Sequence, residues 1–316
     1  MPLFSRHRGI RPRLAPELDD TALGRVLGQV EPLWSLGQLE TVVDLLDDVV
    51  RDTGQNWDRK GHRLKVLAES VGRIVPGYWR RHHPGAQAAL LLHAWSDVVH
   101  ARSQGSPCDL SETRKTCLRA AELVPDDPNP WTVLLAALRL ERRPNQEMAE
   151  VWREIKARDT WNREAHLQAL GYLSPQECGS TGLMMDLVDG VRAEMPADAP
   201  TAGLEVTAIV RGYQRTLTSG GLAAVTISEH WSRPDAAQAL GVAATHWTTP
   251  GFLTHAAAVA DLNVLAYALV KAARTEEAGR ALHATQGIAT PWPWNADGDP
   301  LEQFTYWRSG LHPDRR

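Results

Sequence analysis

The segment LETVVDLLDDVV, residues 39–50, decides the fold of this chain. Its apolar side chains stand at Leu39, Val42, Val43, Leu46, Val49 and Val50. Because these positions recur every three or four residues, they lie on one face of an α-helix. The segment therefore predicts an amphipathic helix that buries this face against a neighbour.

The same spacing recurs along the chain, at Met148, Val151, Trp152 and Ile155 and again at Met184, Leu187, Val188 and Val191. Ser180 is the expected N-cap of the second of these helices. Proline, which breaks helix interiors, is absent from four long segments, 33–75, 145–174, 201–233 and 251–290. Each segment is long enough for about two helices, so we predict an all-α protein of about twelve to fourteen helices. We expect antiparallel hairpins stacked into a curved α-solenoid.

Strand and membrane signals are weak. The best strand candidates are residues 205–210 and 223–228, and the first reads equally well as a helix. The most apolar stretch, 253–270, is interrupted by His255, Asp261 and Asn263. A membrane-spanning helix needs about 18 to 20 predominantly apolar residues, so we expect a buried helix and no membrane partner.

Composition excludes several classes of protein. The 316 residues can bury the core of one large domain or two smaller ones. With 34 basic and 38 acidic residues the formal charge is -4, which makes a nucleic-acid partner unexpected. Three scattered cysteines, Cys108, Cys117 and Cys178, are too few for a disulfide framework or a thiolate zinc site. We therefore expect a reducing compartment, the cytoplasm.

The two ends of the chain differ from its middle. Residues 1–16 carry four arginines and no apolar run, which predicts a flexible basic tail, not a secretory signal. Residues 17–290 are the expected helical-repeat domain, with a sub-boundary near 103–110. Residues 291–316 begin with Pro-Trp-Pro-Trp, which we expect to be non-helical, and form a Trp-rich C-terminal cap over the last hairpin. The alternative reading of these aromatic residues is a lip on a binding groove.

Three short stretches resemble tetratricopeptide repeats. Residues 36–40 (LGQLE) and 267–278 (YALVKAARTEEA) are similar to the turn inside such a repeat, with Ala273 where the family usually has glycine. Residues 120–131 (AAELVPDDPNPW) are similar to the boundary between two repeats. A shift by the family's period of about 34 residues aligns Leu118 with Trp152 as matching core positions. The resemblance implies an α-solenoid whose concave face binds a peptide or another protein.

One cluster of residues has the spacing of a metal site. His93, Asp97 and His100 stand at i, i+4 and i+7 and share one helical face, where they could bind zinc or iron. Helix geometry puts them opposite Leu91, Trp95 and Val98, on a face that is normally solvated. We therefore expect no cofactor, with a transition metal as the alternative.

His166 lies on an apolar stripe, because Ala169, Leu170 and Leu173 follow it at i+3, i+4 and i+7. We predict a buried imidazole that is hydrogen-bonded to a carbonyl or a carboxylate, Asp159 or Glu164 being candidate partners. Cys178 precedes a helix, but no third residue can be named for a Cys–His pair.

The sequence favours a non-catalytic interaction module over an enzyme. We expect a polypeptide partner, and the oligomeric state stays open. The candidate binding residues are Trp95, Trp131, His166, Trp292 and Trp294. The first alternative is a metal-dependent or histidine-based enzyme built around His93, Asp97 and His100 or around His166. A second is a helical regulator that binds DNA through its basic start.

Overall fold

A computed structural model of the protein describes residues 11–105, 109–220 and 227–311. Sixteen α-helices lie within these ranges, beside two short 3-10 helices and two strands of two residues each. The all-α prediction is therefore confirmed. More helices are present than the roughly twelve to fourteen expected from average helix length, because several are shorter than that average.

The chain divides into two compact units. We call Asp20–Leu204 the N-terminal unit, and Met1–Asp19 together with Glu205–Arg316 the C-terminal unit. The boundary therefore lies at residue 204, not near 103–110, and residues before Asp20 belong with the end of the chain. A solenoid over the whole of 17–290 stays a prediction.

The helices of the N-terminal unit follow one another through short turns. They are α1 (Thr21–Ser35), α2 (Leu39–Arg51), α3 (Trp57–Val71), α4 (Ile74–His82), α5 (Gln87–Gln104), α6 (Ser111–Leu123), α7 (Asn129–Leu140), α8 (Asn145–Arg158), α9 (Arg163–Tyr172), α10 (Thr181–Glu194) and the 3-10 helix η1 (Pro200–Gly203).

The C-terminal unit combines helices with a small strand pair. Its elements are β1 (Arg13–Leu14), α11 (Leu204–Ser219, its first residue in the other unit), the 3-10 helix η2 (Ile227–Ser232), α13 (Pro234–His246), α14 (Ala258–Lys271), α15 (Thr275–Ala284), β2 (Ile288–Ala289), α16 (Pro291–Trp294) and α17 (Pro300–Gly310).

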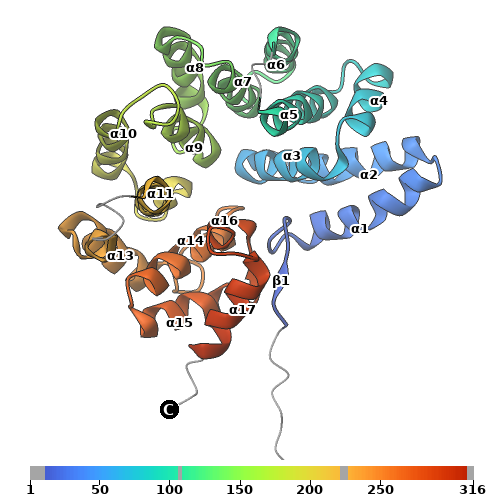
Figure 1. The fold of residues 1–316 in the computed structure, drawn as a ribbon. Coiled ribbons are helices and arrows are strands. Elements are labelled where there is room, and N and C mark those ends of the chain that lie inside the picture. The colour runs from blue at the N-terminus through green and yellow to red at the C-terminus, as the bar shows by residue number, and fades with distance from the viewer. Residues whose placement is uncertain (1–10, 106–108, 221–226, 312–316) are drawn as a thin grey trace, which may run out of the picture. The chain divides into compact units, whose positions relative to one another are not determined.

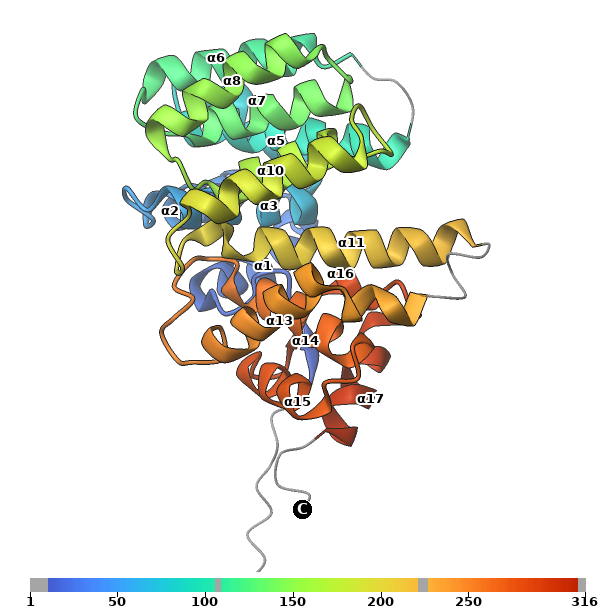
Figure 2. The same cartoon turned by 90° about the vertical axis from the view of Figure 1, so that its left-hand side faces the viewer.

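Alternate helices of the N-terminal unit contact one another in series. α3 packs on α5, α5 on α7, and α7 on α9, which makes one row of helices (Figure 1). α6 covers α5 and α7, and α8 packs on α7, so these two helices form part of a second row (Figure 2). This pairing of sequence neighbours is the expected arrangement of helical hairpins.

The pattern of residues 39–50 is realised as predicted. In α2 the side chains of Val42, Val43, Leu46, Val49 and Val50 are buried in the core of the N-terminal unit. The proline-free segments 33–75, 145–174 and 251–290 each contain two helices, as expected. Residues 205–210 belong to α11, which excludes the strand alternative there, while residues 223–226 lie outside the described ranges.

The two turns that the repeat resemblance pairs have the same geometry. Gly37 has φ +73° and Ala273 has φ +57°, both in the left-handed region. In each turn this residue donates its N–H to a carbonyl three residues back, and the next residue donates to one five residues back. These two bonds define the Schellman motif. A third such turn, centred on Arg142, joins α7 to α8.

A buried polar network joins α3, α5 and the start of α7. Lys60 Nζ donates to Gln87 Oε1 at 2.6 Å and to Asp127 Oδ2 at 2.7 Å. The other oxygen of Asp127 accepts from the backbone N–H and the side-chain amide of Asn129, both at 2.8 Å. Each buried charge is thus paired and hydrogen-bonded, as burial requires. The network also explains Gly61, because a Cβ there would lie 2.4 Å from Asn129 Oδ1.

The start of the chain belongs to the core of the C-terminal unit, as far as it is described. β1 pairs with β2 in parallel, with Arg13 opposite Ile288. Ala15 and Leu18 are buried in a cluster with Ala257, Val259 and Ile288. Residues 13–16 are therefore not part of a flexible tail, because they form strand and core contacts that lie far apart in sequence. Residues 1–10, including Arg6 and Arg8, lie outside the described ranges.

The C-terminal aromatic segment folds onto α14. Trp294 is fully buried between the rings of Tyr267 and Phe304, at centroid distances of 5.4 and 5.7 Å, and its indole N–H donates to Asn263 Oδ1 at 2.9 Å. Residues 291–294 form one helical turn in which only Trp292 has non-helical dihedral angles. The expectation that this stretch is non-helical is therefore correct for Trp292 alone.

No helix in the described ranges is both long and apolar enough to cross a membrane.

Candidate functional site

A groove of about 440 Å³ lies in the N-terminal unit between α6 and α8, with α7 as its floor. The floor consists of Trp131, Leu134 and Leu138, which stand at i, i+3 and i+7 and therefore form one stripe along α7. The groove lies on the side of α7 that packs on α6 and α8.

Leu118 of α6 forms one apolar wall of this groove and Val151 of α8 forms the other. Leu118 is 45% exposed, so the expectation that it occupies a core position is wrong. Its helix packs on α5 and α7, and Leu118 faces the groove instead of either neighbour. Leu118 and the half-buried Trp131 are the accessible apolar side chains of the groove, whereas Val151 is buried in the core.

Trp131 is held in place but lacks a hydrogen-bond acceptor. The Arg158 guanidinium lies 5.2 Å from the ring centroid, within the range of a cation–π contact. Arg158 is itself fixed by Glu154 at 2.7 Å and by the Pro125 carbonyl at 2.5 Å. The indole N–H of Trp131 is enclosed and has no acceptor among the described residues. An enclosed donor without an acceptor costs about 1–3 kcal/mol.

The rim of the groove carries more acidic than basic side chains. Glu147, Glu150 and Glu154 stand at i, i+3 and i+7 on α8, and the basic members are Arg114 and Arg153. Hydrogen bonds from Arg143 lower the pKa of Glu147, and Arg158 pairs with Glu154. Glu150 has no cation partner among the described residues and accepts a hydrogen bond from the Gln146 amide at 3.5 Å. Its carboxylate is available to a basic group.

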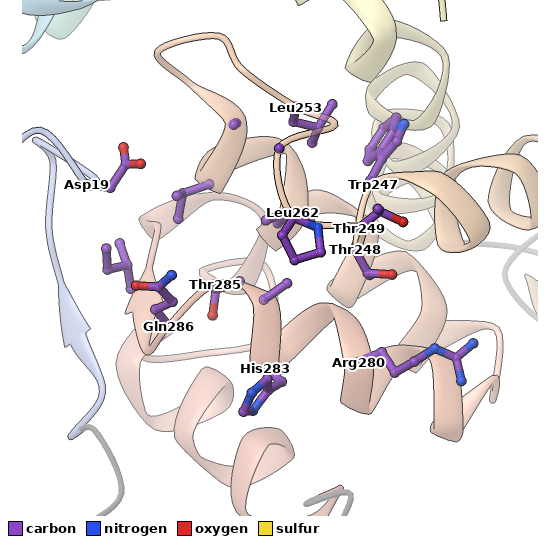
Figure 3. A pocket seen from close by; sticks show the side chains of 16 residues that line it. Asp19, Trp247, Thr248, Thr249, Leu253, Leu262, Arg280, His283, Thr285 and Gln286 are labelled. Carbon is purple, nitrogen blue, oxygen red and sulfur yellow. The ribbon is translucent and has the colours of Figure 1, made fainter. Parts of the chain in front are cut away.

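A second cavity, of about 600 Å³, lies within the C-terminal unit (Figure 3). Residues 247–253, the start of α14, the end of α15, β2 and Asp19 surround it. Its apolar lining comprises Trp247, Leu253, Ala258, Val259, Leu262 and Ile288. Its polar lining includes Asp19, Thr248, Thr249, Arg280, His283 and Gln286. A volume between about 300 and 1,000 Å³ is typical of sites for small molecules.

Asp97 in the histidine cluster of α5 contacts His93 in its own helix and also Arg73 and Thr113 outside it. His93 Nδ1 lies 3.3 Å from Asp97 Oδ2, while Asp97 also accepts hydrogen bonds from Arg73 at 2.7 Å and from Thr113 at 3.1 Å. Burial alone would raise the pKa of Asp97, but the contacts with His93 and Arg73 lower it.

We expected this face of α5 to be solvated. Instead, Thr113 of α6 and Arg73 cover it in part. His100 is exposed and one to two turns away from the other two. The described residues contain no group of three or more histidine, cysteine or acidic side chains placed to hold a metal ion.

His166 is buried, as predicted, and lies between the rings of Trp152 and Trp161. Its Nδ1 is 2.7 Å from the carbonyl oxygen of Asn162, so the expected carbonyl partner is present but Asp159 and Glu164 are not the partners. Burial lowers the pKa of His166 to about 4. The imidazole is neutral at neutral pH, and a neutral ring donates to this carbonyl through Nδ1.

The tryptophans named as binding candidates divide into two groups. Trp95 is buried in the core of the N-terminal unit with Leu91 and Val98, and Trp294 is buried against α14, so neither faces a partner. Trp292 is half-buried and donates its indole N–H to Gln214 Oε1 at 2.8 Å. Trp131 is the candidate that lines a groove.

Cys178 is exposed, and Ser180 caps α10 as predicted, accepting from the Leu183 N–H at 3.2 Å.

The groove residues Leu118, Leu134, Leu138 and Glu150 were missed by the sequence analysis. The spacing of Leu134 and Leu138 after Trp131 was the available signal. It does not distinguish residues that line a groove from residues of the hydrophobic core. Comparisons with family models, curated proteins and solved structures found no match for this chain.

Proposed function

We propose that the protein is a non-catalytic interaction module that binds a polypeptide segment in the groove between α6 and α8. The observation that carries the proposal is Trp131, a rigid aromatic side chain on an apolar floor, whose enclosed N–H has no acceptor. Tryptophan and arginine dominate the energetic centres of protein interfaces, and Arg158 lies over this ring. Because the N–H is enclosed in the free protein, its pairing with a carbonyl oxygen of the bound segment requires the indole to reorient beneath Arg158.

The chemistry of the groove defines the segment. The stripe of Trp131, Leu134 and Leu138 favours apolar side chains at helical spacing, because a partner helix lays such a stripe into a groove. The carboxylate of Glu150 favours a basic residue beside that stripe. The proposed partner is therefore an amphipathic helix with leucine-like residues on one face and lysine or arginine next to them.

Two designed peptides of about three helical turns test this proposal. One carries leucine on one face and lysine on the other, and its match carries glutamate in place of lysine. Fluorescence anisotropy of the labelled peptides with the full chain should show saturable binding of the lysine peptide and weaker binding of the glutamate peptide. The Glu150→Lys variant should reverse that preference.

Matched substitutions locate the binding surface. Leu118→Asp removes an apolar wall and should weaken binding of the lysine peptide about tenfold or more. Leu183→Asp is the control, since Leu183 is 48% exposed on α10 and does not line the groove. Equal loss in both variants, or no loss in Leu118→Asp, would contradict the proposal.

A further inference from the structure

The cavity of the C-terminal unit has charges of opposite sign at its two sides. Asp19 and Arg280 both line it and stand apart from one another across it (Figure 3). Asp19 is exposed and has no cation partner among the described residues. The cavity therefore offers an anionic group at one side and a cationic group at the other.

Arg280 is available to a ligand. It pairs with Glu276 Oε1 at 3.2 Å, and the two side chains are 47% and 80% exposed. Ion pairs this exposed contribute little, so a bound carboxylate can replace Glu276 at low cost. His283 follows one turn later on α15 and lines the same cavity.

Apolar and hydrogen-bonding groups occupy the space between the charges. Trp247, Val259 and Leu262 give the cavity an apolar surface, which suits aliphatic side chains. The hydroxyl group of Thr248 donates to the Ala244 carbonyl at 3.3 Å and can accept a hydrogen bond, while that of Thr249 can donate or accept one. The cavity thus combines an apolar surface with groups that can hydrogen-bond to the N–H and C=O of an amide.

Gln286 places an amide side chain in the lining of the cavity. It lines the cavity and has φ +53°, a left-handed conformation at the end of α15 that glycine adopts without strain. Gln286 donates its N–H to the His283 carbonyl three residues back, so its left-handed conformation ends α15 as Ala273 ends α14.

We propose that this cavity binds a free apolar di- or tripeptide. Its terminal carboxylate pairs with Arg280, its terminal ammonium pairs with Asp19, and its aliphatic side chains pack on Trp247 and Leu262. Gln286 hydrogen-bonds to the peptide backbone. This site is separate from the groove of the N-terminal unit and does not depend on the function proposed for it.

The test uses three probes with the full chain in calorimetric titrations. These are leucyl-alanyl-leucine, its N-acetylated form, which lacks the ammonium, and its C-terminal amide, which lacks the carboxylate. We expect the unmodified tripeptide to bind about tenfold more tightly than either capped form, as charge-assisted hydrogen bonds predict.

Two substitutions assign each end of the ligand. Asp19→Asn should weaken binding of the unmodified tripeptide and leave binding of its N-acetylated form unchanged. Arg280→Gln should weaken binding of the unmodified tripeptide and leave binding of the amide unchanged. Both residues are exposed, so neither change removes core packing.

A third comparison uses two left-handed residues. Gln286→Gly and Ala273→Gly both relieve a positive φ, so both should raise thermal stability, but only Gln286→Gly should weaken binding of the tripeptide. The proposal is overturned if the wild type shows no saturable binding, if the three probes bind equally, or if Ala273→Gly weakens binding as much. Leu118→Asp, in the other unit, should leave tripeptide binding unchanged, so this test and that of the groove fail independently.

Discussion

Replacing His166 by leucine should remove a defined part of the chain's acid sensitivity. His166 is 2% exposed, and burial lowers its pKa from 6.5 to about 4. Between these values the unfolded chain binds a proton that the folded chain excludes. Since the folded-state pKa is the lower one, stability is complete above the unfolded pKa and falls as the pH decreases toward 4.

The magnitude follows from the size of this shift. A full shift from 6.5 to about 4 corresponds to about 3 kcal/mol, and about 2 kcal/mol of it is lost between about pH 7 and pH 4.5. Leucine at this position keeps the apolar contacts with Trp152 and Trp161 but does not titrate. The Asn162 carbonyl remains satisfied by the backbone N–H of residue 166 at 3.1 Å.

Urea unfolding followed by far-UV circular dichroism measures the effect in wild type and His166→Leu at both pH values. Burial raises the pKa of Glu164, but other effects, chiefly that of Lys65, lower it more, to about 2. The stability that Glu164 contributes therefore falls at lower pH in both proteins, and this change cancels when the two proteins are compared. The variant should lose about 2 kcal/mol less than wild type on acidification. Identical losses, or an imidazole that titrates near pH 6.5 in NMR spectra, would refute the reasoning.

Three further predictions concern stability and are measured by thermal or urea unfolding. Gly61→Ala should destabilise the N-terminal unit by about 1–3 kcal/mol, because the new Cβ would displace Asn129 from the buried network. The control Gly28→Ala should stabilise by about 0.5–1 kcal/mol, because no atom lies within 4 Å of the new Cβ. Destabilisation by both substitutions would contradict this prediction. Gly37→Ala should destabilise by about 1 kcal/mol and Ala273→Gly should stabilise by a similar amount, because both residues have a positive φ in the same kind of turn. Stabilisation by Gly37→Ala, or destabilisation by Ala273→Gly, would contradict this. Trp294→Ala should cost about 3–5 kcal/mol through the cavity left between Tyr267 and Phe304, and an unchanged melting temperature would exclude its role in the core.

Local patterns predicted the features that depend on neighbours in sequence. The buried face of residues 39–50, the cap at Ser180 and the burial of His166 all follow from spacing along one helix. The turn at Ala273 also has the geometry that its resemblance to residues 36–40 indicated.

Features that depend on distant segments were not predicted. The exposure of Leu118 is decided by which helices pack on α6, and periodicity carries no such information. Arg73 and Thr113 reach Asp97 from outside its helix, and β1 pairs with a strand near the other end of the chain. The cavity of the C-terminal unit likewise combines five parts of the chain, which are Asp19, residues 247–253, α14, α15 and β2.

The state of the Trp131 indole tests the proposed binding groove most directly. In a nitrogen–proton correlation spectrum of the full chain, the indole signal of Trp131 is identified among those of the twelve tryptophans by its loss in Trp131→Phe. On addition of the lysine-bearing peptide this signal should move toward that of a hydrogen-bonded N–H, while the signals of buried Trp95 and Trp294 stay in place. A bound peptide that leaves the Trp131 signal unmoved would contradict the account.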